Sequence, residues 1–144
     1  MKKILPILLL LFMLTGCGEV PKELTNNAVY EDWQLELKEA TTYTTDEGEN
    51  MLRVHAIFTN NGAESLYAAC SFAVRAFQND IQLDEYSDIN GAEEALIREI
   101  KDGQSIEVYY VFKLSDESEV EVLIGTPTAD MDTIGREVYL SAEE

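Results

Sequence analysis

Alternation of apolar and polar residues is the feature that most constrains the fold of this chain. From Trp33 onward, apolar side chains recur at every second position in several short runs, and clusters of Gly, Asn and Asp separate these runs. In the clearest run, from Ile106 to Leu114, every even-numbered residue is apolar or aromatic. A period of two places successive side chains on opposite faces of an extended strand. The chain is therefore predicted to fold from strands that each bury one face.

Seven or eight short strands are predicted, with almost no helix. In the run from Leu66 to Ala76, Cys70 shares the apolar positions, so we expect it to be buried. Between Ala92 and Ile100 we predict a helical turn followed by a short strand, because Ala and Glu favour helix. Short strands with frequent turns indicate an antiparallel β-sandwich, with a small β-barrel as the alternative. The other predicted strands lie at 33–37, 41–45, 52–58, 81–83, 106–114, 120–124 and 138–140.

The first 17 residues have the layout of a secretion signal that ends in a cysteine. Lys2 and Lys3 precede an apolar run from Ile4 to Leu14, which is shorter than the roughly 20 residues that a permanent membrane-spanning helix needs. Leu14-Thr15-Gly16-Cys17 then resembles the lipobox of bacterial lipoproteins. The resemblance implies a diacylglyceryl group on Cys17, cleavage after Gly16 and anchoring on the outer face of the bacterial cytoplasmic membrane. The alternative is an ordinary secretion signal followed by an unmodified Cys17.

These features divide the chain into a signal peptide at 1–16, a tether at 17–32 and a single domain at 33–144. The tether is polar, contains Pro21 and shows no period. The domain is long enough to bury a substantial hydrophobic core. If Cys17 carries lipid, Cys70 has no partner within the chain, so we expect no disulfide.

The strong negative charge restricts the possible partners. The chain has 28 Asp and Glu against 10 Lys and Arg, and its net charge falls from −18 to −20 when Lys2 and Lys3 leave with the signal peptide. Such a surface repels nucleic-acid phosphates and anionic lipid headgroups. We therefore expect no nucleic-acid partner, and membrane attachment through the lipid alone. Because the acidic residues are scattered, we interpret them as a solubilising extracellular surface; attraction of cations or basic partners is the alternative.

Candidate catalytic and metal-binding residues are few. His55 is the only histidine, and its position in the alternation predicts that it faces outward or toward the edge of the sheet. Cys70 has the opposite position, which argues against a nucleophilic pair. Calcium at the acidic loop 84–91 or at Asp130 and Asp132 is possible, but the loop lacks the first and last ligands of an EF-hand. We expect no enzyme, no metal and no cofactor. Aromatic side chains that could contact a glycan or a protein are Trp33, Tyr43, Tyr86 and Tyr109.

Three segments carry a family resemblance. They read LRVHAIFTNN at 52–61, AFQNDIQL at 76–83 and KDGQSIEV at 101–108, and a closing strand pair follows from Tyr110 to Val122. Together they resemble the small Gram-positive lipoproteins with an immunoglobulin-like domain of unknown function. Asp80 and Asp102 stand where Gly and Pro would be usual. The resemblance covers about residues 30–140 and implies an immunoglobulin-like sandwich, with no catalytic residues and no accepted ligand.

We therefore predict a membrane-anchored, non-enzymatic binding module. Its expected partner is an envelope or extracellular protein, contacted through a sheet face or the end loops. The alternative is a carbohydrate- or calcium-binding accessory lipoprotein of a transport system.

Overall fold

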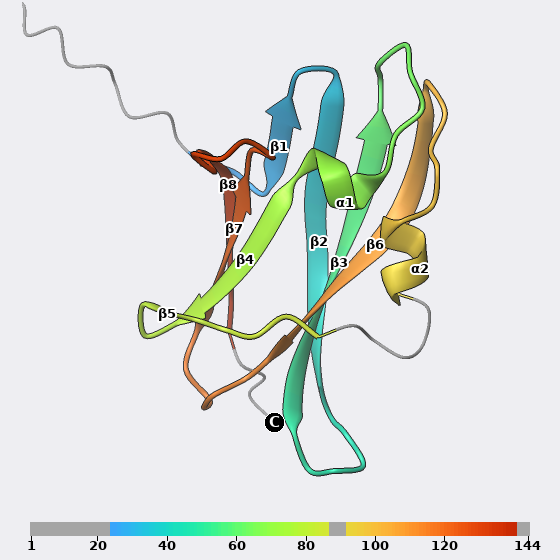
Figure 1. The fold of residues 1–144 in the computed structure, drawn as a ribbon. Coiled ribbons are helices and arrows are strands. Elements are labelled where there is room, and N and C mark those ends of the chain that lie inside the picture. Colours follow the sequence, from blue (N-terminus) through green and yellow to red (C-terminus); the bar gives the residue numbers. More distant parts are fainter. Residues whose placement is uncertain (1–23, 87–91, 141–144) are drawn as a thin grey trace, which may run out of the picture.

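Two antiparallel sheets of four strands face each other in the computed structural model, which describes residues 24–86 and 92–140 (Figure 1). The predicted signal peptide and Cys17 lie outside the described residues. One sheet has the strand order β1 (Asn27–Tyr30), β2 (Trp33–Thr44), β3 (Asn50–Asn60) and β6 (Gln104–Lys113). The other has the order β5 (Ile81–Gln82), β4 (Ala73–Gln78), β7 (Val120–Gly125) and β8 (Thr133–Tyr139). Two short helices are α1 (Ala68–Ser71) and α2 (Ala92–Leu96).

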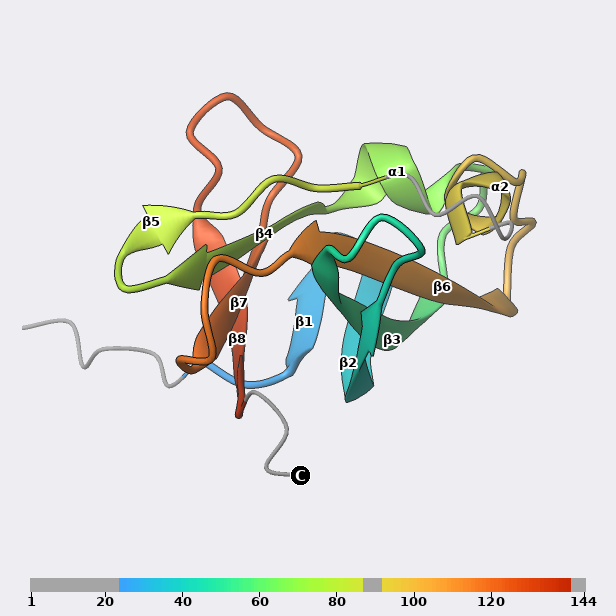
Figure 2. The same cartoon turned by 90° about the horizontal axis from the view of Figure 1, so that it is seen from below.

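The strand order is that of an immunoglobulin-like sandwich. Strands β2, β3 and β6 correspond to strands A, B and E of that fold, whereas β4, β5, β7 and β8 correspond to C, C′, F and G. The view along the strands in Figure 2 separates the two layers. The predicted immunoglobulin-like fold is confirmed. The barrel alternative is wrong, because the described strands form two four-stranded sheets and do not close into a barrel.

The core lies between the sheets and is supplied by the alternation read from the sequence. The inward side chains of β3 from Leu52 to Phe58 are at most 1% exposed, and those of β7 from Val120 to Ile124 are fully buried. Phe58 meets Phe72 edge-on, with ring centroids 6.2 Å apart. Each such buried side chain contributes about 1.5–3 kcal/mol by leaving water. This burial holds the two sheets together without a disulfide among the described residues.

The predicted strand from Leu66 to Ala76 is wrong over its first half. Residues Ala68–Ser71 form α1, β4 begins only at Ala73, and Cys70 is exposed rather than buried. This segment carries the chain from the first sheet to the second, so it cannot stay extended within either one. Leu66 instead exchanges backbone hydrogen bonds with Ile100, at 3.0 and 2.8 Å. The spacing of apolar residues here therefore reflects a crossing between layers.

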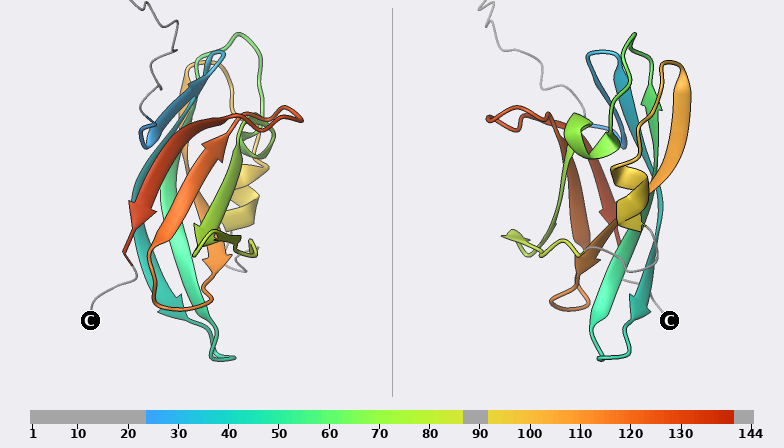
Figure 3. Two further views of the ribbon diagram at one scale, coloured as in Figure 1. Left: turned by 90° about the vertical axis from the view of Figure 1, so that its left-hand side faces the viewer. Right: turned by 45° about the vertical axis from the view of Figure 1, so that its right-hand side comes forward.

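Other boundaries shift for similar reasons. The helical turn predicted after Ala92 is confirmed as α2, which packs beside β6 (Figure 3), but the strand predicted to follow it is only a single bridge at Ile100. The segments predicted at 33–37 and 41–45 form one strand, β2, with a bulge between Leu37 and Ala40. The last strand is β8, which starts earlier than predicted and ends before the exposed Leu140.

The folded part of the chain begins inside the segment that we assigned to the tether. Strand β1 pairs with β2 and buries Ala28 to 1% exposure. Next to it, Thr25 lies parallel to β8, and the backbone N–H of Arg136 donates to its carbonyl at 2.9 Å. Gly135 permits this approach, since a Cβ there would lie 2.9 Å from the same carbonyl oxygen. This contact joins the two sheets along one side of the sandwich.

Candidate functional site

Four side chains form a continuous stack on the outward face of the first sheet. Arg53 of β3 lies between two tyrosines, with its Cζ 5.9 Å from the ring centroid of Tyr43 on β2 and 5.2 Å from that of Tyr109 on β6. The ring of His55 stacks on Tyr109 at 5.1 Å, with 22° between the planes. We call these four residues the aromatic ladder. All are half-buried, so they present ring faces and charged edges to the surroundings without projecting freely.

Two apolar side chains lie beside the ladder residues on the same face of the sheet. Met51 and Val111 point to the outward face of the sheet, yet they are only 2% and 1% exposed. In register, Met51 lies opposite Tyr43, and Val111 lies opposite Arg53. Neither belongs to the cluster between the sheets, so the long side chains of the outward face must shield them. The ladder is thus a packed, water-excluding surface.

Charged residues frame the ladder. The Nε2 of His55 lies 3.4 Å from the Oε1 of Glu107, a contact at ion-pair distance. Further along the face, Lys113 pairs with Glu49 and lies 5.9 Å above the ring of Tyr86. The hydrogen bond with Glu49 raises the pKa of the Lys113 ammonium, which therefore stays charged. The face thus combines stacked rings with positive and negative groups.

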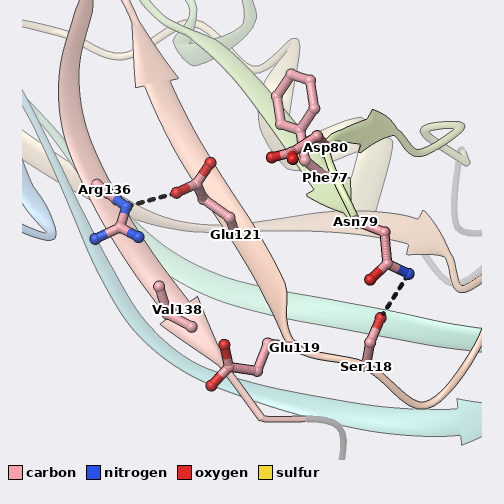
Figure 4. A pocket seen from close by; sticks show the side chains of 8 residues that line it. All are labelled: Phe77, Asn79, Asp80, Ser118, Glu119, Glu121, Arg136 and Val138. Carbon is pink, nitrogen blue, oxygen red and sulfur yellow. Dashed lines mark hydrogen bonds and ion pairs between the residues drawn. The ribbon is translucent and has the colours of Figure 1, made fainter.

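A shallow pocket of about 350 Å³ lies on the outward face of the second sheet (Figure 4). Its polar groups are largely paired with one another: the Nε of Arg136 donates to Glu121 at 2.6 Å, and the Nδ2 of Asn79 donates to the Oγ of Ser118 at 3.2 Å. We interpret it as a junction between strands and turns. The pocket is lined by Phe77, Asn79, Asp80, Ser118, Glu119, Glu121, Arg136 and Val138.

The structure does not assemble the other candidate residues into a reactive site. His55 lies on the outward face of β3, whereas Cys70 lies in α1 on a different part of the sandwich. Asp84 is tied to β6, because its carbonyl accepts a backbone hydrogen bond from Lys113 at 3.0 Å. Residues 87–91 of the predicted calcium loop fall outside the described residues. Within residues 24–86 and 92–140, no three His, Cys, Asp or Glu side chains gather where they could hold a metal.

Two titratable groups near the edge of β6 are perturbed. Burial raises the pKa of Glu85. Burial, and to a lesser degree the negative charge of Glu85, raise the pKa of the Tyr110 hydroxyl, which therefore stays protonated.

Sequence reasoning anticipated part of the ladder. It placed His55 on the outward face and named Tyr43 and Tyr109 as contact residues. It did not single out Arg53, although Arg53 and His55 are two positions apart and therefore share a face. Of the other two named aromatics, Tyr86 is 41% exposed beside Lys113, and Trp33 packs on Tyr30 with ring centroids 5.8 Å apart.

Fold and site together define an immunoglobulin-like sandwich with an aromatic, charged outward face. Comparison with known families agrees. The chain belongs to the family described as the domain of unknown function DUF5067, whose model matches residues 20–124. This confirms the resemblance to a Gram-positive family of unknown function with this fold. No helix in the described part of the chain is both long enough and apolar enough to cross a bilayer.

Solved structures share the fold at low sequence identity. A protein from Staphylococcus aureus, provisionally described as a lipoprotein, is 11% identical with a TM-score of 0.66, over 82% of this chain and 90% of that one. The YcdA protein of Bacillus subtilis, described in the same way, is 14% identical with a TM-score of 0.62, over 85% of this chain and 40% of that one. The YjhA protein of B. subtilis is 10% identical with a TM-score of 0.53, over 83% and 98%. No curated protein matches the chain.

Proposed function

We propose that this chain is a lipoprotein anchored through Cys17 on the outer face of the cytoplasmic membrane, and that its domain binds an envelope or extracellular protein. Two findings support the anchoring. Leu14-Thr15-Gly16-Cys17 resembles a lipobox directly after an apolar segment. Two of the structural relatives, from S. aureus and B. subtilis, are themselves provisionally described as lipoproteins. Two acyl chains on one cysteine would give stable attachment, because each buried methylene contributes about 0.8 kcal/mol.

The aromatic ladder is the observation that supports a binding role. Tyr and Arg dominate the energetically important residues of protein interfaces, and they do so where neighbouring groups exclude water. Here Tyr43, Arg53 and Tyr109 are already ordered by mutual stacking over Met51 and Val111. These three side chains therefore lose little conformational entropy when a partner binds them. No enzymatic role is proposed.

The anchoring can be tested with the two cysteines of the chain. Cys17→Ala should release the domain into the medium or leave an unprocessed precursor, because no thiol remains for the lipid. Cys70→Ala is the matched control and should stay membrane-bound, because Cys70 lies in the folded domain. The measurement is fractionation together with mass spectrometry of the amino-terminal peptide. Membrane-bound, acylated Cys17→Ala protein would contradict the proposal.

The binding role can be tested by crosslinking on intact cells. A photo-crosslinking amino acid in place of Tyr109 should capture a discrete protein, whereas the same amino acid in place of Val138, on the outward face of the other sheet, should not. Arg53→Ala should lower the yield at position 109, because it removes the centre of the stack. Equal capture at both positions, or none at 109, would refute the ladder as the partner's binding site. An adduct sensitive to glycosidases and resistant to proteases would favour the carbohydrate alternative.

A further inference from the structure

Strand β2 is paired over its whole length on one side but only partly on the other. Strand β1 covers its first residues, and the backbone N–H of Leu37 donates to the carbonyl of Asn26 at 2.8 Å. From Glu39 to Thr44, no strand of the described chain lies beside β2 on that side, although β3 pairs with it on the other side as far as Thr44. This half of β2 is therefore an open sheet edge.

The bulge in β2 determines which backbone groups face that edge. Leu37 pairs with Ala56, and Ala40 pairs with Val54, so the bulge inserts one extra residue into β2. Alternate residues of an antiparallel strand direct both N–H and C=O to the same side. The N–H of Leu37 points to the β1 side. The extra residue of the bulge shifts the alternation by one position, so beyond it the N–H groups of Ala40, Thr42 and Thr44 point to that side. These three residues offer donors and acceptors in the spacing of a further strand.

Residues 40–45 lack the charges and the proline that protect many sheet edges, although a bulge precedes them. Exposed sheet edges are normally blunted by charged residues or proline, which discourage pairing with another chain. Residues 40–45 read ATTYTT, with neither charge nor proline and with high β-propensity. Two other edges are partly covered: Thr25 lies along β8, and the N–H of Tyr86 donates to the Val111 carbonyl on β6 at 2.8 Å.

The charges around the edge indicate what can occupy it. Lys38 and Glu39 precede the uncharged run, and Glu36 pairs with Lys38. Asp46 and Glu47 follow the run, so the charge at each end is acidic on balance. A second copy of the processed chain, with a net charge of −20, would be repelled. An extended segment with Lys or Arg at its ends would be attracted, and it would lie beside Tyr43, the ladder residue on β2.

We infer that the open edge of β2, from Ala40 to Thr44, binds an extended basic segment of the partner protein by β-strand addition. This inference rests on the protein-binding role proposed above and specifies its mode. The partner's backbone pairs with Ala40, Thr42 and Thr44, so that the sheet that carries the ladder gains a strand. Acidic residues at both ends of the run select for basic side chains.

The test uses the lipidated protein in detergent and the synthetic peptide acetyl-Lys-Thr-Val-Thr-Val-Thr-Lys-amide. At about ten times its dissociation constant, the peptide should slow hydrogen exchange at the amides of Ala40, Thr42 and Thr44 about tenfold. The same peptide with alternate N-methyl groups on its pairing edge should give no protection. Equal protection by the methylated peptide would overturn the inference. So would slow exchange at these amides in the free protein, whether its own chain or a second copy covers the edge.

Two substitutions at Thr42 distinguish a role of its backbone N–H from a role of its side chain. Thr42→Pro removes an outward N–H without breaking a bond to β3, a place where an edge strand tolerates proline. Thr42→Val keeps the N–H. The proline variant should lose peptide binding while the valine variant keeps it. Equal binding by both would refute the inference, and the methylated peptide decides the question if the proline variant unfolds.

Crosslinking separates this inference from the proposed function. Undiminished capture at position 109 in the folded Thr42→Pro variant would refute the edge inference and leave the binding role intact. Peptide binding at the edge, without capture at position 109, would refute the ladder as the partner's site instead.

Discussion

The buried amide of Gln78 at the end of β4 allows a quantitative test of how this sandwich is held together. Its side chain is 2% exposed and contacts the backbone of the loop that carries the chain from β6 to β7. The Nε2 donates to the carbonyls of Asp116 and Ser118 at 3.1 and 2.9 Å. The Oε1 accepts from the N–H of Ser115 at 2.7 Å and, at a long 3.4 Å, from that of Asp116. The Gln78 side chain thus supplies hydrogen bonds to backbone groups that regular secondary structure would otherwise pair.

Gln78→Met keeps the length of the side chain and removes these bonds. Three hydrogen bonds of ordinary length contribute about 1 kcal/mol each, and the backbone groups left behind must find water. Burial of the methionine side chain offsets about 1 kcal/mol of this loss in the free energy of unfolding. We therefore expect the free energy of unfolding to fall by about 2–3 kcal/mol.

The assay is equilibrium urea unfolding of the Cys17→Ala protein with and without the substitution. Gln82→Met, at an exposed position on the neighbouring strand β5, is the matched control and should change stability by less than about 0.5 kcal/mol. Faster hydrogen exchange at Ser115 would locate the damage in the loop. A Gln78→Met protein as stable as the control would refute the reasoning, because the loop would then not depend on this amide.

Three further outcomes follow from the structure. Gly135→Ala should lower the free energy of unfolding by about 1–3 kcal/mol in urea, because its Cβ would meet the carbonyl of Thr25; unchanged stability would contradict that close approach. Asp80→Gly should raise it by about 0.5 kcal/mol, because φ is +64° at Asp80 in the two-residue turn after β4; a loss of stability would show that the Asp80 side chain matters more. Cys70 should react quickly with a thiol reagent in the native state, and slow labelling would restore the strand first predicted there.

The structure explains the polar residues in two of the segments that carry the family resemblance. In AFQNDIQL, Gln78 is the amide that fixes the loop, and Asn79 and Asp80 have φ of +49° and +64°. These are left-handed conformations in which Gly is favoured, so Asp at position 80 is a strained substitute. In LRVHAIFTNN, the buried Asn60 donates to the carbonyls of Glu64 and Ile100 and accepts from the N–H of Gly62. The resemblance therefore rests on residues that fix connections rather than on residues that bind a ligand.

Local periodicity determined the architecture of this protein. The alternation in β3, β6 and β7 identified the buried side of each strand correctly, because a strand at a core buries every second side chain whichever neighbour it pairs with. The same pattern placed His55 on the outward face. It failed between Leu66 and Phe72, because the chain there crosses from one sheet to the other, and spacing does not distinguish such a crossing from a strand.

Tertiary structure alone decided what lies beside what. Tyr43, Arg53 and Tyr109 come from three strands, and only the register of β2, β3 and β6 stacks them. The burial of Met51 and Val111 on the outward face likewise depends on side chains distant in the sequence. Strand β1 has only 4 residues, too few for an alternation that the sequence would show. It pairs with the first part of β2 alone, so the rest of β2 is left without a neighbour on that side. A sequence pattern reports one-sided burial along a segment, whereas pairing between segments depends on long-range contacts that no local pattern contains.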